Sequence, residues 1–159
     1  MAALSVFVLI ALNYGVYEKE QIKKHGETLF LELAPVDPRS LMQGDYMQLR
    51  YAIADHASVS RSSYDEKRGY LVIRTNAQNV AQFVRFHDGE NLAAGEKLFP
   101  FHQQYGRVII NPGSFFFQEG HAEYYENSKY GIFKFEGADK RLLIGLADSN
   151  QEKITAIDL

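Results

Sequence analysis

The clearest alternation of hydrophobic and polar residues in this chain lies between residues 46 and 53. Met47, Leu49, Tyr51 and Ile53 form one set of alternate positions. The intervening positions are Tyr46, Gln48, Arg50 and Ala52. Successive side chains of a strand point to opposite faces of a sheet, so this stretch predicts a strand with Met47, Leu49 and Tyr51 on its buried face.

Shorter alternating stretches predict further strands, separated by turn-forming residues. They cover residues 29–33, 70–75, 80–86, 97–103, 107–110, 115–118, 132–136 and 141–147. Residues 121–129 have a composition suited to a short helix, and the serine-rich residues 55–69 are expected to form a loop. The sequence therefore predicts a mainly β, β-rich α+β fold: one compact antiparallel domain with a short helix.

The N-terminal segment has a different pattern. Residues 2–17 contain no charged side chain. As a helix they would be about 24 Å long, against about 30 Å for the hydrocarbon core of a bilayer. A buried helix and a cleaved signal peptide are alternatives, but the run has no basic segment before it, and an uncleaved anchor is favoured. The predicted organisation is a transmembrane anchor (1–17), a juxtamembrane helix or linker (18–28) and a β-rich soluble domain (29–159).

Composition narrows the classes of function. The 159 residues carry a net charge of -3, so no general attraction to nucleic acid is expected. The absence of cysteine excludes disulfides, thiolate metal sites and cysteine nucleophiles. Eleven Phe and ten Tyr residues favour buried sheet faces.

Several motifs occur in an order that resembles one known family. The phrase Gly-Asp-Tyr-x-x-Leu-x-Tyr fills residues 44–51, after Pro-Val-Asp-Pro-Arg at residues 35–39. Phe-Phe-Gln-Glu-Gly follows at residues 116–120, and Leu-Ile-Gly-Leu at residues 143–146. The chain thus resembles the GDYXXLXY family of bacterial membrane-anchored proteins. The resemblance implies one N-terminal membrane helix and a small extracytoplasmic domain, often encoded beside polytopic membrane proteins, and it assigns no reaction.

The orientation in the membrane rests on two opposed signals. The basic residues near the apolar segment follow it, at Lys19, Lys23 and Lys24, which by the positive-inside rule places the domain in the cytoplasm. The family layout implies the extracytoplasmic side. We favour a single-pass protein of the bacterial inner membrane with a periplasmic domain.

Within the family phrase, the residues divide into structural and exposed candidates. Leu49 and Tyr51 are expected in the core, and Gly44 is expected to permit a tight turn. Asp45 is suited to accept hydrogen bonds from turn amides. Asp45 and Tyr46 are the candidates for contact with a partner.

Charged residues in the family-like blocks give a second set of candidates. For Arg39, Asp37 and Glu119 two readings stay open: weak ion pairs at the surface, or a buried pair of Arg39 with a carboxylate that holds the proline-rich loop. A sharper alternative is a polar cleft made by Arg39, Asp45 and Glu119.

Evidence for catalysis is weak. Ser40 and Gly44–Asp45 are similar to segments of membrane-anchored signal peptidases, with Lys97 as the base, but the Ser-x-Ser-Met-x-Pro pattern is absent. The histidines have no metal-binding spacing, and no cofactor motif occurs, so no metal or cofactor is expected. Phe115, Phe116 and Phe117 are expected in the core, or in a protein interface if exposed.

The predicted function is a non-catalytic accessory subunit of a polytopic inner-membrane protein. The alternatives are a domain that binds or senses small molecules and, less favoured, a Ser/Lys hydrolase.

Overall fold

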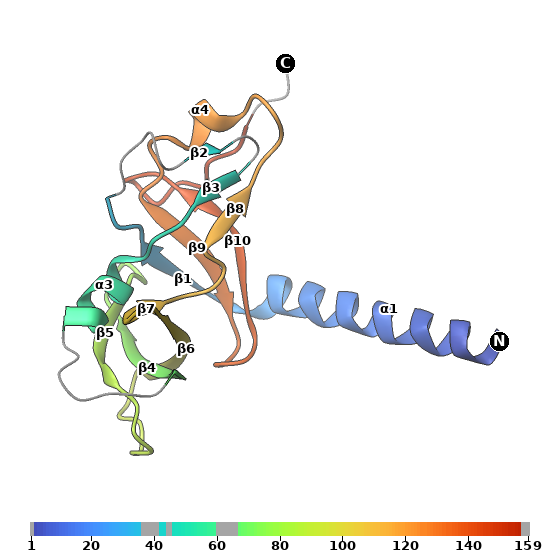
Figure 1. Cartoon of the computed structure of the whole chain (residues 1–159), viewed down its shortest axis with the longest axis horizontal. Coiled ribbons are helices and arrows are strands. Elements are labelled where there is room, and N and C mark those ends of the chain that lie inside the picture. Colours follow the sequence, from blue (N-terminus) through green and yellow to red (C-terminus); the bar gives the residue numbers. More distant parts are fainter. Residues whose placement is uncertain (1, 36–41, 44–45, 60–66, 157–159) are drawn as a thin grey trace.

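The computed structural model describes residues 2–35, 42–43, 46–59 and 67–156, which form a β-rich domain with one long projecting helix (Figure 1). The helices are α1 (Ala2–His25), α3 (Ala52–Val59) and α4 (Ala122–Tyr125). The strands are β1 (Glu27–Glu32), β2 (Met42–Gln43), β3 (Tyr46–Gln48), β4 (Arg68–Thr75), β5 (Ala81–Phe86), β6 (Glu96–Gln104), β7 (Arg107–Ile109), β8 (Ser114–Phe116), β9 (Tyr130–Phe135) and β10 (Arg141–Ala147). The predicted β-rich antiparallel domain is confirmed.

The described strands form sheets with the orders β1-β9-β10, β2-β3-β8 and β5-β4-β6-β7, and every pairing within them is antiparallel. β9 and β10 form the predicted hairpin near the C-terminus, and β1 adds to the other edge of β9. The core lies where these sheets meet.

Aromatic side chains join the sheets in that core. Phe99 of β6 and Phe133 of β9 are fully buried, with ring centroids 5.7 Å apart. Tyr51 packs edge-on against Phe133 at 5.8 Å, and Phe135 stacks on Phe99 at 6.3 Å. Each such pair stabilises the fold by about 0.5–1.5 kcal/mol beyond the area that it buries. Part of the high Phe and Tyr content therefore fills the space between the sheets.

The prediction of one strand over residues 46–53 is wrong in its second half. β3 ends at Gln48, Tyr51 makes a single bridge to Leu33, and α3 begins at Ala52. Ile53, Ala54 and Ala57 are buried. That spacing belongs to one face of a helix, and it competes with the strand pattern over a short run. The same helix corrects the loop expected from residue 55 onward, as far as residue 59.

The N-terminal helix includes the predicted anchor and the residues that follow it. α1 runs without interruption from Ala2 to His25, across the boundary drawn between residues 17 and 18. Among the helices that the structure describes, none is both long enough and apolar enough to cross a membrane. The predicted transmembrane helix is thus not found in the described residues, and in the sequence Asn13 and Gly15 interrupt the apolar run.

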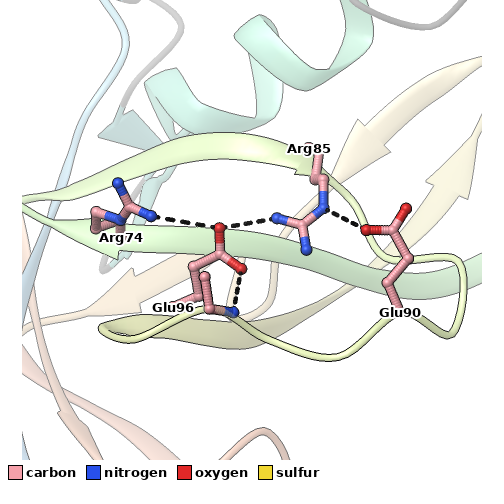
Figure 2. A network of polar contacts seen from close by, with 5 residues as sticks. Arg74, Arg85, Glu90 and Glu96 are labelled. Atoms are coloured by element: carbon pink, nitrogen blue, oxygen red, sulfur yellow. Dashed lines mark hydrogen bonds and ion pairs between the residues drawn. The ribbon is translucent and has the colours of Figure 1, made fainter.

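A network of ion pairs lies at one end of the sheet formed by β4, β5 and β6 (Figure 2). Glu96 accepts hydrogen bonds from the Arg85 guanidinium at 2.9 Å and the Ala93 amide at 3.0 Å, with Arg74 at 3.5 Å. Arg85 also lies 3.3 Å from Glu90. The Glu96 side chain is only 5% exposed, so its charge depends on these partners.

Replacement of Glu96 by Gln is expected to make stability less dependent on pH. The Ala93 amide, followed by Arg85 and Arg74, holds the pKa of Glu96 below its usual range. The stabilisation is therefore complete above the unfolded-state pKa of about 4.3 and is lost as the pH falls through the lower folded-state value. Thermal melts of E96Q and wild type should differ most near neutral pH and converge in acid. E90Q, at a residue that is 58% exposed, is the matched control with a smaller effect. An E96Q deficit that is equal at every pH would contradict the assignment.

Candidate functional site

The strand of the family-like phrase lies at the centre of a small sheet, between β2 and β8. Tyr46 pairs with Phe116, Met47 with Phe115 and Gln48 with Ser114. Met47, Leu49 and Tyr51 are buried, at 3%, 6% and 2% exposure. The alternation in the sequence thus places these three side chains in the core, and the polar positions face outward.

Tyr51 is the most constrained residue of the phrase. Its hydroxyl donates a hydrogen bond to the Pro112 carbonyl at 2.8 Å. Burial raises the pKa of the Tyr51 phenol well above its usual range, against a smaller opposing effect from Arg141. The phenol is therefore neutral at any physiological pH, and it anchors the segment before β8 rather than exchanging protons.

Tyr46 and Phe116 form an aromatic pair on the outer face of the same sheet. Their ring centroids are 5.8 Å apart, and Phe116 is 72% exposed. Phe115 and Phe117 instead pack against Tyr125 of α4, at 5.2 and 5.4 Å. Only one of the three consecutive phenylalanines is thus free to contact another molecule.

A cavity of about 240 Å³ lies beside β3. Its lining includes Glu32, Pro35, Gln48, Arg50, Glu126 and Lys129. The side chains around it carry both signs of charge, and Met47 and Leu49 also contribute to its wall.

Comparison with known proteins identifies the family. A family model described as GDYXXLXY protein matches residues 8–146, which includes most of α1 and nearly all of the β domain. The chain belongs to the GDYXXLXY family. No curated protein and no solved structure gives a significant match.

The described part of this GDYXXLXY protein covers some of the predicted site residues. Tyr46, Leu49, Tyr51 and Glu119 are described, and Glu119 is exposed in the turn before α4. Arg39, Gly44 and Asp45 lie outside the described residues, together with Asp37 and Ser40. The predicted ion pair and the predicted cleft therefore stay predictions.

Candidate catalytic and metal-binding groups are dispersed in the described residues. Lys97 pairs with Glu27 at 3.2 Å. Within the described ranges, no group of three or more histidine or carboxylate side chains is arranged to hold a metal ion. The described residues of the phrase thus make packing contacts in the core, and Tyr46 pairs with the exposed Phe116 on the outer face.

Arg141 is a half-buried cation that the sequence did not single out. Its guanidinium lies 5.3 Å from the centre of the Phe99 ring, and Nη1 donates a hydrogen bond to the Ala138 carbonyl at 3.0 Å. Its Nε atom is buried and finds no hydrogen-bond partner among the described residues. Burial lowers the pKa of Arg141, while Asp139 favours its charged form. No local spacing marks this residue, because the ring under its guanidinium, Phe99, belongs to a strand far away in the sequence.

Proposed function

We propose that this protein is a membrane-attached, non-catalytic accessory domain: the apolar part of α1 embeds in lipid, and the β domain binds a membrane-protein partner. The observation that carries the proposal is the exposure of the apolar part of α1. That segment projects away from the β domain along its length (Figure 1). A long apolar surface of this kind is rare on a protein surrounded by water.

The exposure extends around the whole circumference of the helix. Val6, Phe7, Val8, Leu9 and Ile10 are consecutive and are each between 47% and 69% exposed. Five consecutive residues pass through more than one helical turn. A helix that is hydrophobic all round belongs in a protein core or in lipid, and the β domain does not supply that core.

The polar groups of α1 are compatible with insertion of its first part. The Asn13 side-chain amide donates a hydrogen bond to the Leu9 carbonyl at 2.8 Å, so this donor is satisfied within the helix. Residues 18–25 carry the charges and form the end of α1 that contacts the domain, where Ile22 is buried. The apolar end is thus free to enter lipid while the charged end stays at the surface.

The partner surface that we propose is the aromatic pair of Tyr46 and Phe116. Aromatic side chains are enriched in the centres of protein interfaces. The pair stands on the outer face of the sheet that contains the family phrase, and Met47 and Gln48, which follow Tyr46, line the cavity of mixed charge. It therefore combines an apolar anchor with nearby polar groups, as interfaces commonly do.

Flotation with vesicles of phosphatidylethanolamine and phosphatidylglycerol tests the attachment. Wild-type protein is expected to float with the vesicles, and the double variant L9K/L12K is expected to stay in the aqueous fraction. Each lysine near the centre of an inserted helix opposes insertion by roughly 2.5–3.5 kcal/mol. Wild-type protein that remains entirely soluble would overturn the proposal.

Val59→Cys is a control at an exposed hydrophobic residue outside α1. Val59 is 89% exposed, so its replacement should leave flotation unchanged. Because the chain contains no other cysteine, the new thiol also reports the side of the membrane. We expect an impermeant maleimide to label V59C on intact spheroplasts, as the proposed extracytoplasmic location requires. Labelling only after lysis would place the domain in the cytoplasm.

Extraction in mild detergent tests the accessory role separately from the attachment. The protein is expected to elute as a stoichiometric complex with a polytopic membrane protein, and Phe116→Asp is expected to release it as a monomer. A wild-type protein recovered only as a monomer would contradict the partner and leave the attachment intact.

A further inference from the structure

A basic pocket opens on the β domain at a distance in sequence from the family phrase. It has a volume of about 290 Å³ and is lined by Arg68, Pro100, Phe101, His102, Asn111 and Arg141. β4, β6 and β10 each contribute to it. The described lining holds two arginines and a histidine and no carboxylate, a composition suited to an anion.

The cations of the pocket keep unused hydrogen-bonding capacity. Arg68 is exposed and makes no ion pair with any residue that the structure describes. It lies directly opposite His102 in the antiparallel pairing of β4 and β6. The buried Nε of Arg141 also finds no partner in the described chain. An unpaired buried donor is unfavourable, and an oxygen ligand would relieve it.

The neighbouring acidic group leaves the pocket positive. Asp139 favours the charged form of Arg141, and it also accepts a long hydrogen bond of 3.4 Å from the Tyr70 hydroxyl. Among the residues that the structure describes, Asp139 is the carboxylate whose charge acts on Arg141, and the pocket also holds the guanidinium group of Arg68. An excess of positive charge therefore remains for a ligand.

The position of the pocket relative to α1 indicates where that ligand comes from. Lys140, the residue before Arg141, forms an ion pair of 3.6 Å with Glu18 of α1. Glu18 directly follows Tyr17, the last residue of the apolar segment. If the apolar segment lies in lipid, the start of β10 lies close to the level of the phospholipid headgroups.

We propose that Arg68, His102 and Arg141 form a pocket for the phosphate of an anionic phospholipid headgroup. This inference rests on the proposed attachment through α1 and adds the class of lipid that the domain recognises. Guanidinium groups donate paired hydrogen bonds to phosphate oxygens with matching geometry. Pro100 and Phe101 supply an apolar wall for the glycerol part of the headgroup.

Flotation with two kinds of vesicle tests the pocket. Wild-type protein should bind vesicles that contain phosphatidylglycerol more tightly than vesicles of phosphatidylcholine alone. Arg68→Gln should reduce binding to the anionic vesicles by about fivefold, since one basic residue near such a surface contributes about 1 kcal/mol. Binding to the neutral vesicles should not change. Arg107→Gln removes the same charge from an exposed residue that does not line the pocket, and it should retain the preference.

The outcomes separate this inference from the attachment. Equal losses for R68Q and R107Q would show a general charge effect and overturn the pocket, while binding to neutral vesicles would still support α1 as the anchor. Failure of the wild type to bind either vesicle would overturn the attachment as well. Release of the protein from anionic vesicles by millimolar inorganic phosphate, at constant ionic strength, would show a free-phosphate site and overturn the lipid assignment.

Discussion

Tyr51→Ala is expected to lower the free energy of unfolding by about 3–5 kcal/mol, the range found when large buried aromatic side chains are truncated. Tyr51 is 2% exposed and packs against Phe133, so the truncation opens a cavity where the sheets meet. It also leaves the Pro112 carbonyl without the Tyr51 hydroxyl. Because natural domains are stable by only about 5–15 kcal/mol, this change removes a large part of the total. Chemical denaturation followed by circular dichroism measures it.

Tyr51→Phe separates the ring from the hydroxyl. The variant keeps the packing and loses the hydrogen bond to Pro112, so a smaller loss of about 1 kcal/mol is expected. Tyr105→Ala is the matched control, because Tyr105 is 96% exposed and its truncation should change stability by less than about 0.5 kcal/mol. If Tyr51→Ala were as stable as Tyr105→Ala, the last residue of the family phrase would not be a core residue, and a binding role would have to be considered for it.

The parts of the fold that the sequence predicted are those in which local alternation is long and turn residues are distinct. β6 buries alternate residues, whereas β4, β9 and β10 each bury three consecutive residues, and short apolar runs bounded by turn residues predict such strands as well. α3 was missed because Ile53 continues the alternation of β3, while the burial of Ala54 and Ala57 is specified by contacts far away in the chain. A short apolar run does not distinguish the two periods by itself.

The candidate site residues also divide into those that the local sequence pattern predicts and those that depend on contacts between distant segments. The outward position of Tyr46 follows from its place in the alternating stretch, whereas the exposure of Phe116 depends on which neighbour Tyr125 covers. Arg68 of β4 and Arg141 of β10 belong to different sheets, and the packing of those two sheets brings them to one pocket. The spacing of residues in the sequence does not indicate that these two arginines lie in one pocket, so neither was predicted as a site residue.

Gly26→Ala is expected to destabilise the junction between α1 and the β domain by about 1–3 kcal/mol, as overpacking of a tight site does. Gly26 is the single residue between α1 and β1. A methyl group at this position would lie 2.5 Å from the Ile22 carbonyl oxygen and 3.1 Å from the Phe135 amide nitrogen. Both neighbours are backbone atoms, so the clash is relieved only by moving the helix or the β9–β10 hairpin.

Gly15→Ala is the matched control within the same helix. Apart from the helix's own backbone, no atom of the described residues lies within 4 Å of the added methyl group, and alanine favours a helix over glycine by about 1 kcal/mol. The same substitution should therefore stabilise α1 at residue 15 and destabilise its junction at residue 26. Chemical denaturation of the two variants measures the contrast, and equal stabilities would show that the junction yields freely. A rigid junction matters for the membrane proposal, because Gly26 then fixes the angle at which the domain, with its basic pocket, stands on the lipid surface.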